Sequence, residues 1–161
     1  YFRTKENIFD RILDEKIELM GETVLSAFGK PNLPLLERLK EGISHHFDFL
    51  IKNPDLPRFI VNEVTSRPER YETMQWRIGR LADTLVQNMQ HELDESARRG
   101  ETERMDVRML MLDIVSLNIF SFIALPIIQP LIGKLAGDRE EFYKLRKQEN
   151  IELIMRRLKK S

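Results

Sequence analysis

Residues 105–125 read MDVRMLMLDIVSLNIFSFIAL, and this stretch decides the class of fold. On a helix drawn through it, Val107 and Ile114 lie on one side and Leu112 and Val115 on another, so that apolar residues occur nearly all round. A helix at the edge of a single chain needs only one apolar face. The stretch therefore predicts a helix covered on all sides, partly by its own chain and partly by a second copy.

The same region raises the question of a membrane, because residues 114–133 carry no charge and are numerous enough to span a bilayer. Polar residues interrupt the run, among them Ser116, Asn118 and Gln129, and so do Pro126 and Pro130. This composition favours a buried helix of a soluble protein, and we expect no membrane partner.

Outward from this stretch, apolar residues recur at helical spacing, and no alternation typical of strands is found. Gly and Pro residues separate the segments, so that Pro126 is expected to end the helix that begins near residue 105. We predict an all-α fold of about six helices in an orthogonal or antiparallel bundle. The predicted helices cover residues 4–28, 34–52, 55–65, 68–99, 105–125 and 138–160, with a short additional turn near residues 127–131.

Composition limits the function. The chain has 161 residues, 42% hydrophobic and 32% charged, as in a soluble domain with a sizeable core. Lys and Arg number 26 and Asp and Glu also 26, so the net charge is zero, unlike a domain that holds nucleic acid by charge. With no Cys, disulfides, thiol nucleophiles and Cys-based metal sites are excluded, which fits a cytoplasmic protein.

Residues that could support catalysis or metal binding are poorly arranged. His45 and His46 are adjacent, so their side chains point about 100° apart on a helix and cannot chelate one ion together. Carboxylates such as Asp10 and Asp14 are interleaved with Arg11 and Lys16, which predicts a solvated helix face with i, i+4 ion pairs. We therefore expect no enzyme activity, no metal and no cofactor.

Two residues suggest a ligand pocket. Trp76 lies off the apolar stripe of its segment and needs a cover, which is a neighbouring helix, a partner or a ligand. Asn118 stands among apolar residues, where a buried amide bonds across an interface, caps the break at Pro126 or faces a ligand. We expect a cavity enclosed by the first four helices with the fifth as floor, for a small apolar or aromatic molecule. The lining candidates are Trp76, Phe47, Ile60 and Leu85, with His46 and Asn118 as polar contacts.

The last two predicted helices favour a homodimer. A second copy is the obvious cover for the apolar side of residues 105–125 that the chain itself leaves open, because large exposed apolar patches are rare on soluble monomers. Residues 138–160 could lie beside it and complete a four-helix bundle about a two-fold axis. The interface candidates are Phe122, Leu125, Ile119, Phe142, Leu145, Ile151 and Ile154.

The opening residues 1–9, YFRTKENIF, resemble a boundary found in TetR-type transcriptional regulators. In that family an aromatic pair ends the third helix of a helix-turn-helix domain, and a Ser/Thr-Lys-Glu cap starts the next helix, as Thr4, Lys5 and Glu6 do here. The turn at residues 53–59, NPDLPRF, is also similar to one in the family. The resemblance covers essentially the whole chain. It implies that residues 1–5 are the remnant of a DNA-binding domain and residues 6–161 an effector-binding and dimerisation domain.

The resemblance also implies a mechanism. A dimer would hold two recognition helices at the spacing of successive major grooves, and a small molecule in the helical body would shift the first helix and weaken operator binding. Tyr1 and Lys5 would contact DNA phosphates, supported by the helix N-terminus that Thr4 caps. The expected function is that of a ligand-responsive DNA-binding transcriptional regulator that acts as a repressor. The alternative is an all-helical interaction or lipid-binding module without a DNA-reading head, and the residues upstream of Tyr1 would distinguish the two.

Overall fold

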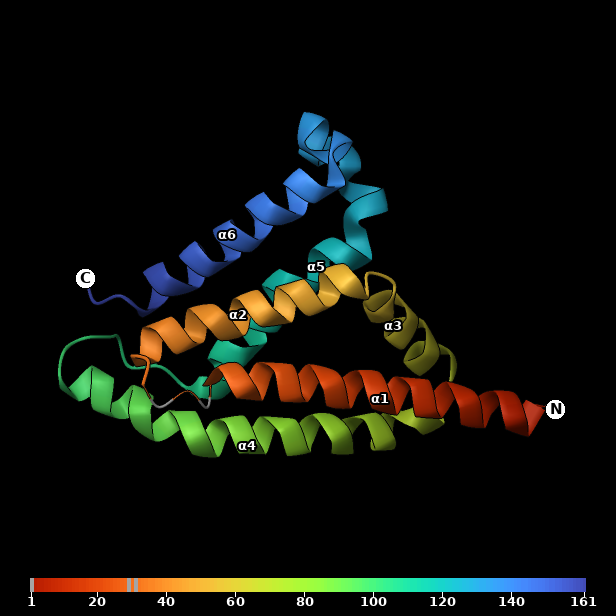
Figure 1. Cartoon of the computed structure of the whole chain (residues 1–161), viewed down its shortest axis with the longest axis horizontal. Helices are drawn as coiled ribbons and strands as arrows, with labels where there is room; N and C mark the ends of the chain where they lie inside the picture. The colour runs from red at the N-terminus through yellow and green to blue at the C-terminus, as the bar shows by residue number, and fades with distance from the viewer. Residues whose placement is uncertain (1, 29, 31) are drawn as a thin grey trace.

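The computed structural model describes residues 2–28, 30 and 32–161, and over these residues it contains helices and no strand (Figure 1). The all-α prediction is confirmed. The elements are α1 (Phe2–Phe28), α2 (Leu35–Lys52), α3 (Leu56–Ser66), the 3₁₀ helix η1 (Pro68–Arg70), α4 (Tyr71–Arg98), α5 (Val107–Ile132), the 3₁₀ helix η2 (Gly133–Gly137) and α6 (Arg139–Leu158).

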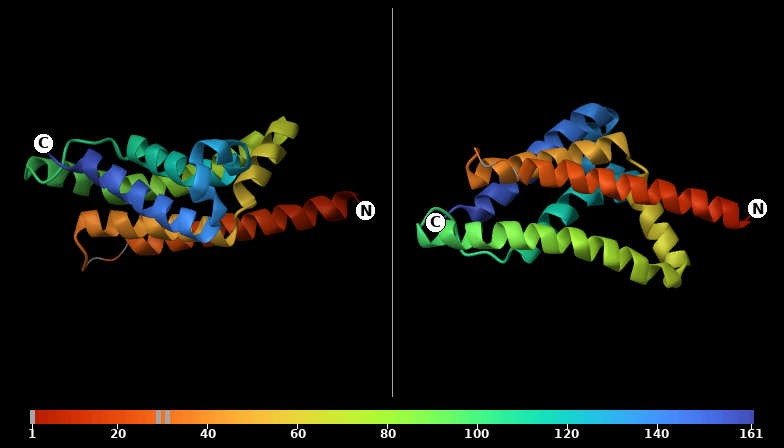
Figure 2. Two further views of the ribbon diagram at one scale, coloured as in Figure 1. Left: turned by 90° about the horizontal axis from the view of Figure 1, so that it is seen from above. Right: turned by 60° about the horizontal axis from the view of Figure 1, so that its bottom comes forward.

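Helix α2 is the centre of the bundle. It packs along α1 on one side and against α5 and α6 on the other. The N-terminal end of α1 projects from one end of the molecule, whereas the C-terminus of the chain lies near the opposite end (Figures 1 and 2). The N-terminal tip of α1 therefore projects beyond the bundle, while its C-terminal end lies within it.

The helix boundaries follow from local chemistry. Asp106 caps α5, because its side chain accepts a hydrogen bond from the Arg108 amide at 2.7 Å. Asp138 caps α6 in the same way through the Glu141 amide at 3.1 Å. After α4, Gly100 takes a φ of +76°, a left-handed conformation that ends helices and favours glycine.

Two predicted boundaries were wrong. Helix α1 begins at Phe2 rather than at Thr4. The backbone amides that Thr4 was expected to cap therefore bond to the preceding helical carbonyls instead. Helix α5 does not end before Pro126 but runs through Pro126 and Pro130 to Ile132. Both prolines are exposed, and the carbonyl that loses its helical partner at Pro130 belongs to the exposed Pro126, so it can be hydrated.

The core consists of two buried clusters, and α2 contributes to both. One joins Leu39 and Ile43 to apolar residues of α4, α5 and α6, such as Leu93. The other is aromatic, with the rings of Phe47 and Phe122 5.3 Å apart. These clusters bind α2, α5 and α6 into one apolar unit.

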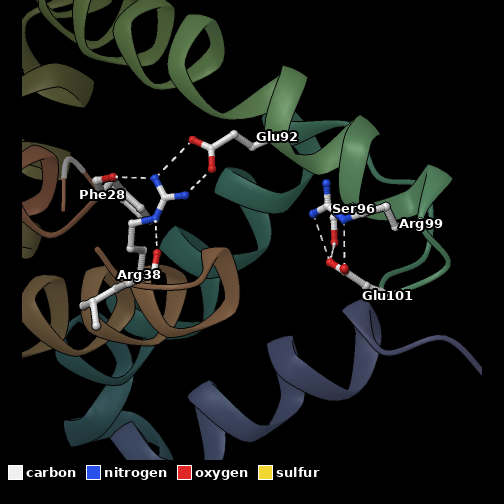
Figure 3. A network of polar contacts seen from close by, with 7 residues as sticks. Phe28, Arg38, Glu92, Ser96, Arg99 and Glu101 are labelled. Carbon is white, nitrogen blue, oxygen red and sulfur yellow. Dashed lines mark hydrogen bonds and ion pairs between the residues drawn. The ribbon is translucent and has the colours of Figure 1, made fainter. Parts of the chain in front are cut away.

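The C-terminal end of α1 is fixed to the bundle by Arg38 of α2 (Figure 3). Its guanidinium donates to the carbonyls of Phe28 and Leu33, each at 3.1 Å, and forms an ion pair with Glu92 of α4. The Arg38 side chain is only 12% exposed. Nearby, the ring of Phe28 occupies the space that a Cβ at Gly42 would need, so α1 and α2 approach closely here.

Candidate functional site

A cavity of about 240 Å³ lies between the N-terminal half of α1, α3, η1 and the start of α4. Part of its lining is apolar, and part is charged. The apolar residues are Leu13, Ile60, Val64 and Met74. The charged residues are Glu6, Asp10, Glu63, Arg67, Glu69, Arg70 and Arg77. A cavity with both kinds of lining suits a small molecule with one charged and one apolar end.

Carboxylates on one face of α1 pair with arginines from α3's end, η1 and α4 across this cavity. The carboxylates are four residues apart, so they lie on one side of the helix. The sequence had suggested ion pairs within α1, and the structure corrects this, because Asp10 and Asp14 pair with another segment. The three pairs are Glu6 with Arg67 (Oε1 to Nη1, 2.7 Å), Asp10 with Arg70, and Asp14 with Arg77.

These three ion pairs form a ladder between α1 and the rest of the domain, and its two sides differ in burial. Arg70 is 18% exposed and Glu63 of α3 is 21% exposed, whereas Asp10 and Glu6 of α1 are 47% and 50% exposed. Glu63 Oε1 lies 3.3 Å from the Nε atoms of both Arg67 and Arg70. Arg70 and Glu63 therefore belong to the body of the domain, whereas Arg67 is 41% exposed and, like the carboxylates of α1, lies at its surface.

Aromatic contacts add to the attachment of α1. The ring of Phe9 lies 4.4 Å from that of Phe59 on α3. The Arg70 guanidinium lies 5.2 Å from the centre of the Phe9 ring, within the range of a cation–π contact. Of the apolar residues in the N-terminal half of α1, Leu13 is buried, but Ile8 is 54% exposed. Ion pairs and a few ring contacts thus hold this half-helix.

A second polar cluster is buried between α2, α5 and α6. The Asn118 amide nitrogen lies 3.0 Å from His46 Nδ1 and donates to the Ile43 carbonyl at 3.2 Å. The Asn150 amide donates to the Asn118 carbonyl oxygen at 3.0 Å. Asn118 and Asn150 are completely buried. Each element thus contributes one polar group to a network that stabilises the packing of the three helices.

Burial lowers the pKa of His46 to about 4, because the charged imidazolium would lose its water shell. The ring is therefore neutral near pH 7. Since an amide nitrogen can only donate, Nδ1 is the acceptor and the ring proton belongs on Nε2. Protonation of Nδ1 would set two donors against each other.

The structure separates the six predicted ligand residues. His46, Phe47 and Asn118 lie in the apolar unit of α2, α5 and α6, and Leu85 is buried in the other cluster. Ile60 lines the cavity. Trp76 is 62% exposed, with the Arg80 guanidinium 5.1 Å from its ring centre.

The expected enclosure of the cavity was partly wrong. Helices α1, α3 and α4 line the cavity, but α2 and α5 do not. The physical reason is that apolar side chains fill the space between α2 and α5. Among the residues that the structure describes, no group of three or more His, Asp or Glu could hold a metal ion.

The sequence model of the family described as "Tetracyclin repressor-like, C-terminal domain" matches residues 36–154, which is most of the chain from α2 to α6. The chain belongs to this family. Comparisons with curated proteins and with solved structures give no match. The TetR resemblance that the sequence indicated is thereby confirmed.

In this TetR-type domain, the predicted DNA-contacting residues lie at the projecting end of α1. Thr4 and Lys5 are exposed there, and Tyr1 lies outside the described residues. Thr4 is within the helix, so it does not act as the cap that the prediction assumed. The two exposed side chains remain candidates for phosphate contacts.

The predicted dimer residues divide into two groups. Phe122, Leu125, Phe142 and Ile154 are buried inside the TetR-type domain itself, so they support the surface rather than form it. Ile119 and Ile151 are half-buried, and Leu145 is exposed. The open apolar side of α5 is made by other residues, some of which the sequence had placed on that side. They are Met109, Leu112, Val115, Phe120, Ile127 and Leu131.

The apolar character of α5 has a further consequence. By length and composition, residues 107–135 could cross a bilayer, and only 33% of their most apolar stretch is buried. Such a helix needs a cover that the single chain does not supply. Either a second copy of the chain or a lipid surface would supply this cover.

Sequence reasoning missed the residues that organise both polar clusters. Asn150 escaped notice because it is one polar residue in a highly charged segment. Arg67 and Arg70 were missed because their partners are about 60 residues away in the sequence. The four-residue spacing of the carboxylates on α1 was the available signal, but it indicates only that they share a face.

Proposed function

We propose that this chain is the effector-binding and dimerisation part of a ligand-responsive, cytoplasmic DNA-binding transcriptional regulator that acts as a repressor. Residues 1–5 would continue a helix-turn-helix domain, and residues 6–161 would form the regulatory domain. Operator DNA would be bound through the N-terminal domain, and the effector would be a small molecule with an apolar or aromatic body. Family membership supports the regulator class.

The observation that carries the proposal is the open apolar side of α5. Phe120 and Leu112 are 56% and 57% exposed on it. Beside it, a groove of about 470 Å³ runs between the end of α5, η2 and α6, and it includes the predicted interface residue Leu145. A two-fold related copy would place α5 and α6 of both chains in a four-helix bundle. This is an interface of the obligate kind, expected to bury more than roughly 2,000 Å² in total.

The proposed mechanism depends on α1. Its projecting end would continue into the DNA-reading head, and its inner half packs along α2. An effector that binds better when α1 is displaced would favour a separation of the two heads that does not fit the operator. By linkage, operator binding would weaken effector binding by the same factor.

Light scattering on the 161-residue chain tests the dimer. We expect twice the mass of 19.1 kDa at micromolar concentration. Phe120→Glu should yield a folded monomer, because it places a charge in the interface without entering the core. Phe122→Glu is unsuitable, since Phe122 is buried and its replacement would unfold the chain. Gln87→Glu, on an exposed position of α4, is the matched control.

Two outcomes contradict the proposal. A wild-type chain that is a well-behaved monomer removes the basis for two heads at a fixed spacing. A monomer that binds phospholipid vesicles through α5, and loses this binding in Phe120→Glu, supports the alternative of a lipid-binding module. That alternative is favoured by one observation, the length and apolar composition of residues 107–135.

DNA binding requires a protein that includes a helix-turn-helix segment before residue 1. Such a protein should bind an operator in a salt-sensitive manner. Lys5→Ala should weaken binding uniformly across sequences and reduce the salt slope by about one, as expected for a phosphate contact. Loss of discrimination at a single base pair would instead place Lys5 in the groove.

A further inference from the structure

We propose that the cavity between α1, α3 and α4 binds a small organic carboxylate, whose anionic group replaces Asp10 and Glu6 on Arg70 and Arg67. The inference rests on the proposed function, because it names the chemical class of the effector. It also gives a direct route from binding to movement of α1, since the displaced carboxylates belong to that helix.

The charges at the cavity favour an exchange of this kind. Arg67 and Arg70 carry two positive charges, and three carboxylates surround them, from Glu6, Asp10 and Glu63. The lining as a whole, which also contains Glu69 and Arg77, has four carboxylates and three guanidiniums, so one negative charge is in excess. If a monoanionic ligand takes the place of the two carboxylates of α1, the ligand and Glu63 balance the two arginines. A neutral ligand leaves the excess negative charge at the cavity unchanged.

Burial decides which group is displaced. The Arg70 guanidinium is mostly covered, and it cannot lose its charge, so it needs an anionic partner. Asp10 is nearly half exposed, and hydration can replace its ion pair at little cost in free energy. Glu63 is as buried as Arg70 and contacts both arginines, so it stays in place. The ligand therefore competes with α1 and not with α3.

The rest of the lining sets the size and the body of the ligand. Leu13, Ile60 and Met74 supply apolar contacts next to the arginines. The cavity of about 240 Å³ is smaller than the roughly 300 Å³ at which pockets for drug-sized ligands begin. A carboxylate forms two parallel hydrogen bonds with a guanidinium, which gives it a fixed orientation. A small aromatic or short-chain aliphatic acid meets these requirements.

Binding would release the first turns of α1 and leave the rest fixed. The first turns are held by the ion pairs of Glu6 and Asp10 that the ligand breaks and by the contact of Phe9 with Phe59, whereas Leu13 and the Asp14–Arg77 pair hold the next turn. The C-terminal end is held by Arg38, which bonds to Phe28 and Glu92 away from the cavity (Figure 3). Displacement of the first turns about the fixed part would move the projecting tip of the helix.

Calorimetry with benzoate, hexanoate and their neutral amides tests the ligand class. At least one acid should bind the 161-residue chain, and benzamide and hexanamide should bind at least roughly tenfold more weakly, because a neutral group forgoes the charge-assisted bonds. If neither acid binds, or if the amides bind as well as the acids, the proposal is wrong.

Two variants are expected to change the affinity in opposite directions. Arg70→Gln should weaken binding of the acid roughly tenfold or more, because it removes the anion partner. Asp10→Asn should strengthen binding about two- to fivefold, because it removes the competitor. A purely structural ion pair would not have this effect, since both variants break the same contact. Arg108→Gln breaks an exposed pair with Asp83 far along α4 and should leave the affinity unchanged.

Movement of α1 can be measured separately. The chain has no Cys, so Asn7→Cys and Gln75→Cys, both at exposed positions, allow spin labels on α1 and α4. The acid that binds should lengthen and broaden the distance between the labels, and Asp10→Asn alone should do so partly. Binding without any change in this distance would overturn the exchange with α1. The dimer measurement is independent of these results, so failure here leaves the regulator proposal standing, and failure there leaves the carboxylate site testable.

Discussion

The two polar clusters of this domain differ in what surrounds them. His46, Asn118 and Asn150 lie in an apolar unit where three helices close on every side. The ladder of α1 is open to solvent on one side and adjoins a cavity on the other. The first network can change only if the core opens, whereas the second can exchange its partners for water or for a ligand.

The difference indicates a division of labour within the TetR-type fold. A buried neutral network is costly to break, because each unpaired polar group stays away from water. Exposed ion pairs contribute little stability individually and can be rearranged. The apolar unit of α2, α5 and α6 thus supports the exposed side of α5. The attachment of α1 is the part of the domain suited to respond to a ligand.

The largest effect on stability is expected in the apolar unit of α2, α5 and α6. Phe47 is completely buried and contacts the rings of Phe122 and Tyr143. Phe47→Ala should lower the free energy of unfolding by about 3–5 kcal/mol, through lost burial and the cavity left behind. Urea denaturation at fixed protein concentration measures it. Phe59→Ala, at a partly exposed ring near α1, should cost clearly less. Equal losses would contradict the distinction between the two regions.

Acid should lower the stability of the apolar unit of α2, α5 and α6 through His46. Its pKa in the folded chain, about 4, is below that of an unfolded histidine, so the unfolded state binds the proton first. The stabilisation is complete above pH 6.5 and is lost as the pH falls toward 4, by roughly 3 kcal/mol in all. His46→Gln should flatten this part of the profile. The exposed His91→Gln is the control, and a profile that His46→Gln leaves unchanged would assign the effect to other groups.

Asn118→Ala is expected to have an intermediate effect. It removes the partner of both His46 and Asn150 within the core. The cost should be about 1–3 kcal/mol in thermal or chemical unfolding, because His46 Nδ1 loses its partner and the Asn150 amide keeps only its bond to the Leu117 carbonyl. Asn88→Ala, at an exposed position of α4, should cost much less. If Asn118→Ala lowers the free energy of unfolding as little as Asn88→Ala does, water reaches the network and the three helices do not close it off.

The ladder should respond weakly in stability but clearly to salt. Asp14→Asn removes the pair with Arg77 and should change the free energy of unfolding by about 1 kcal/mol or less. Raising the salt from 0.05 to 0.5 M should reduce the difference between wild type and variant, since exposed charges are screened. A loss comparable to that of Asn118→Ala would show that the ladder is part of the rigid structure.

Trp76 should show the smallest effect. It is largely exposed in a single chain, so Trp76→Phe should change the stability by less than about 0.5 kcal/mol. Its fluorescence should resemble that of a hydrated indole. A blue-shifted spectrum in the wild type would mean that a partner or a ligand covers the ring, which is the role that the sequence analysis proposed for it.

Much of the architecture could be read from the sequence because helices are specified locally. Apolar spacing and the Gly and Pro residues between segments predicted six helices close to their actual positions. The errors fell where local rules compete. Pro126 was expected to end a helix, but an exposed proline in a long apolar helix costs one hydrogen bond and can be tolerated.

The sequence by itself determined the all-α class, the family resemblance and the presence of an apolar side on α5 that one chain leaves open. Tertiary structure alone decided which polar residues meet. Asp10 pairs with Arg70, and Asn118 bonds to His46 and Asn150, across 32 to 72 residues of sequence. Periodicity states which residues share a helix face, but the partner of that face depends on how the helices pack. The cavity, and with it the proposed carboxylate site, exists only because α1, α3 and α4 come together.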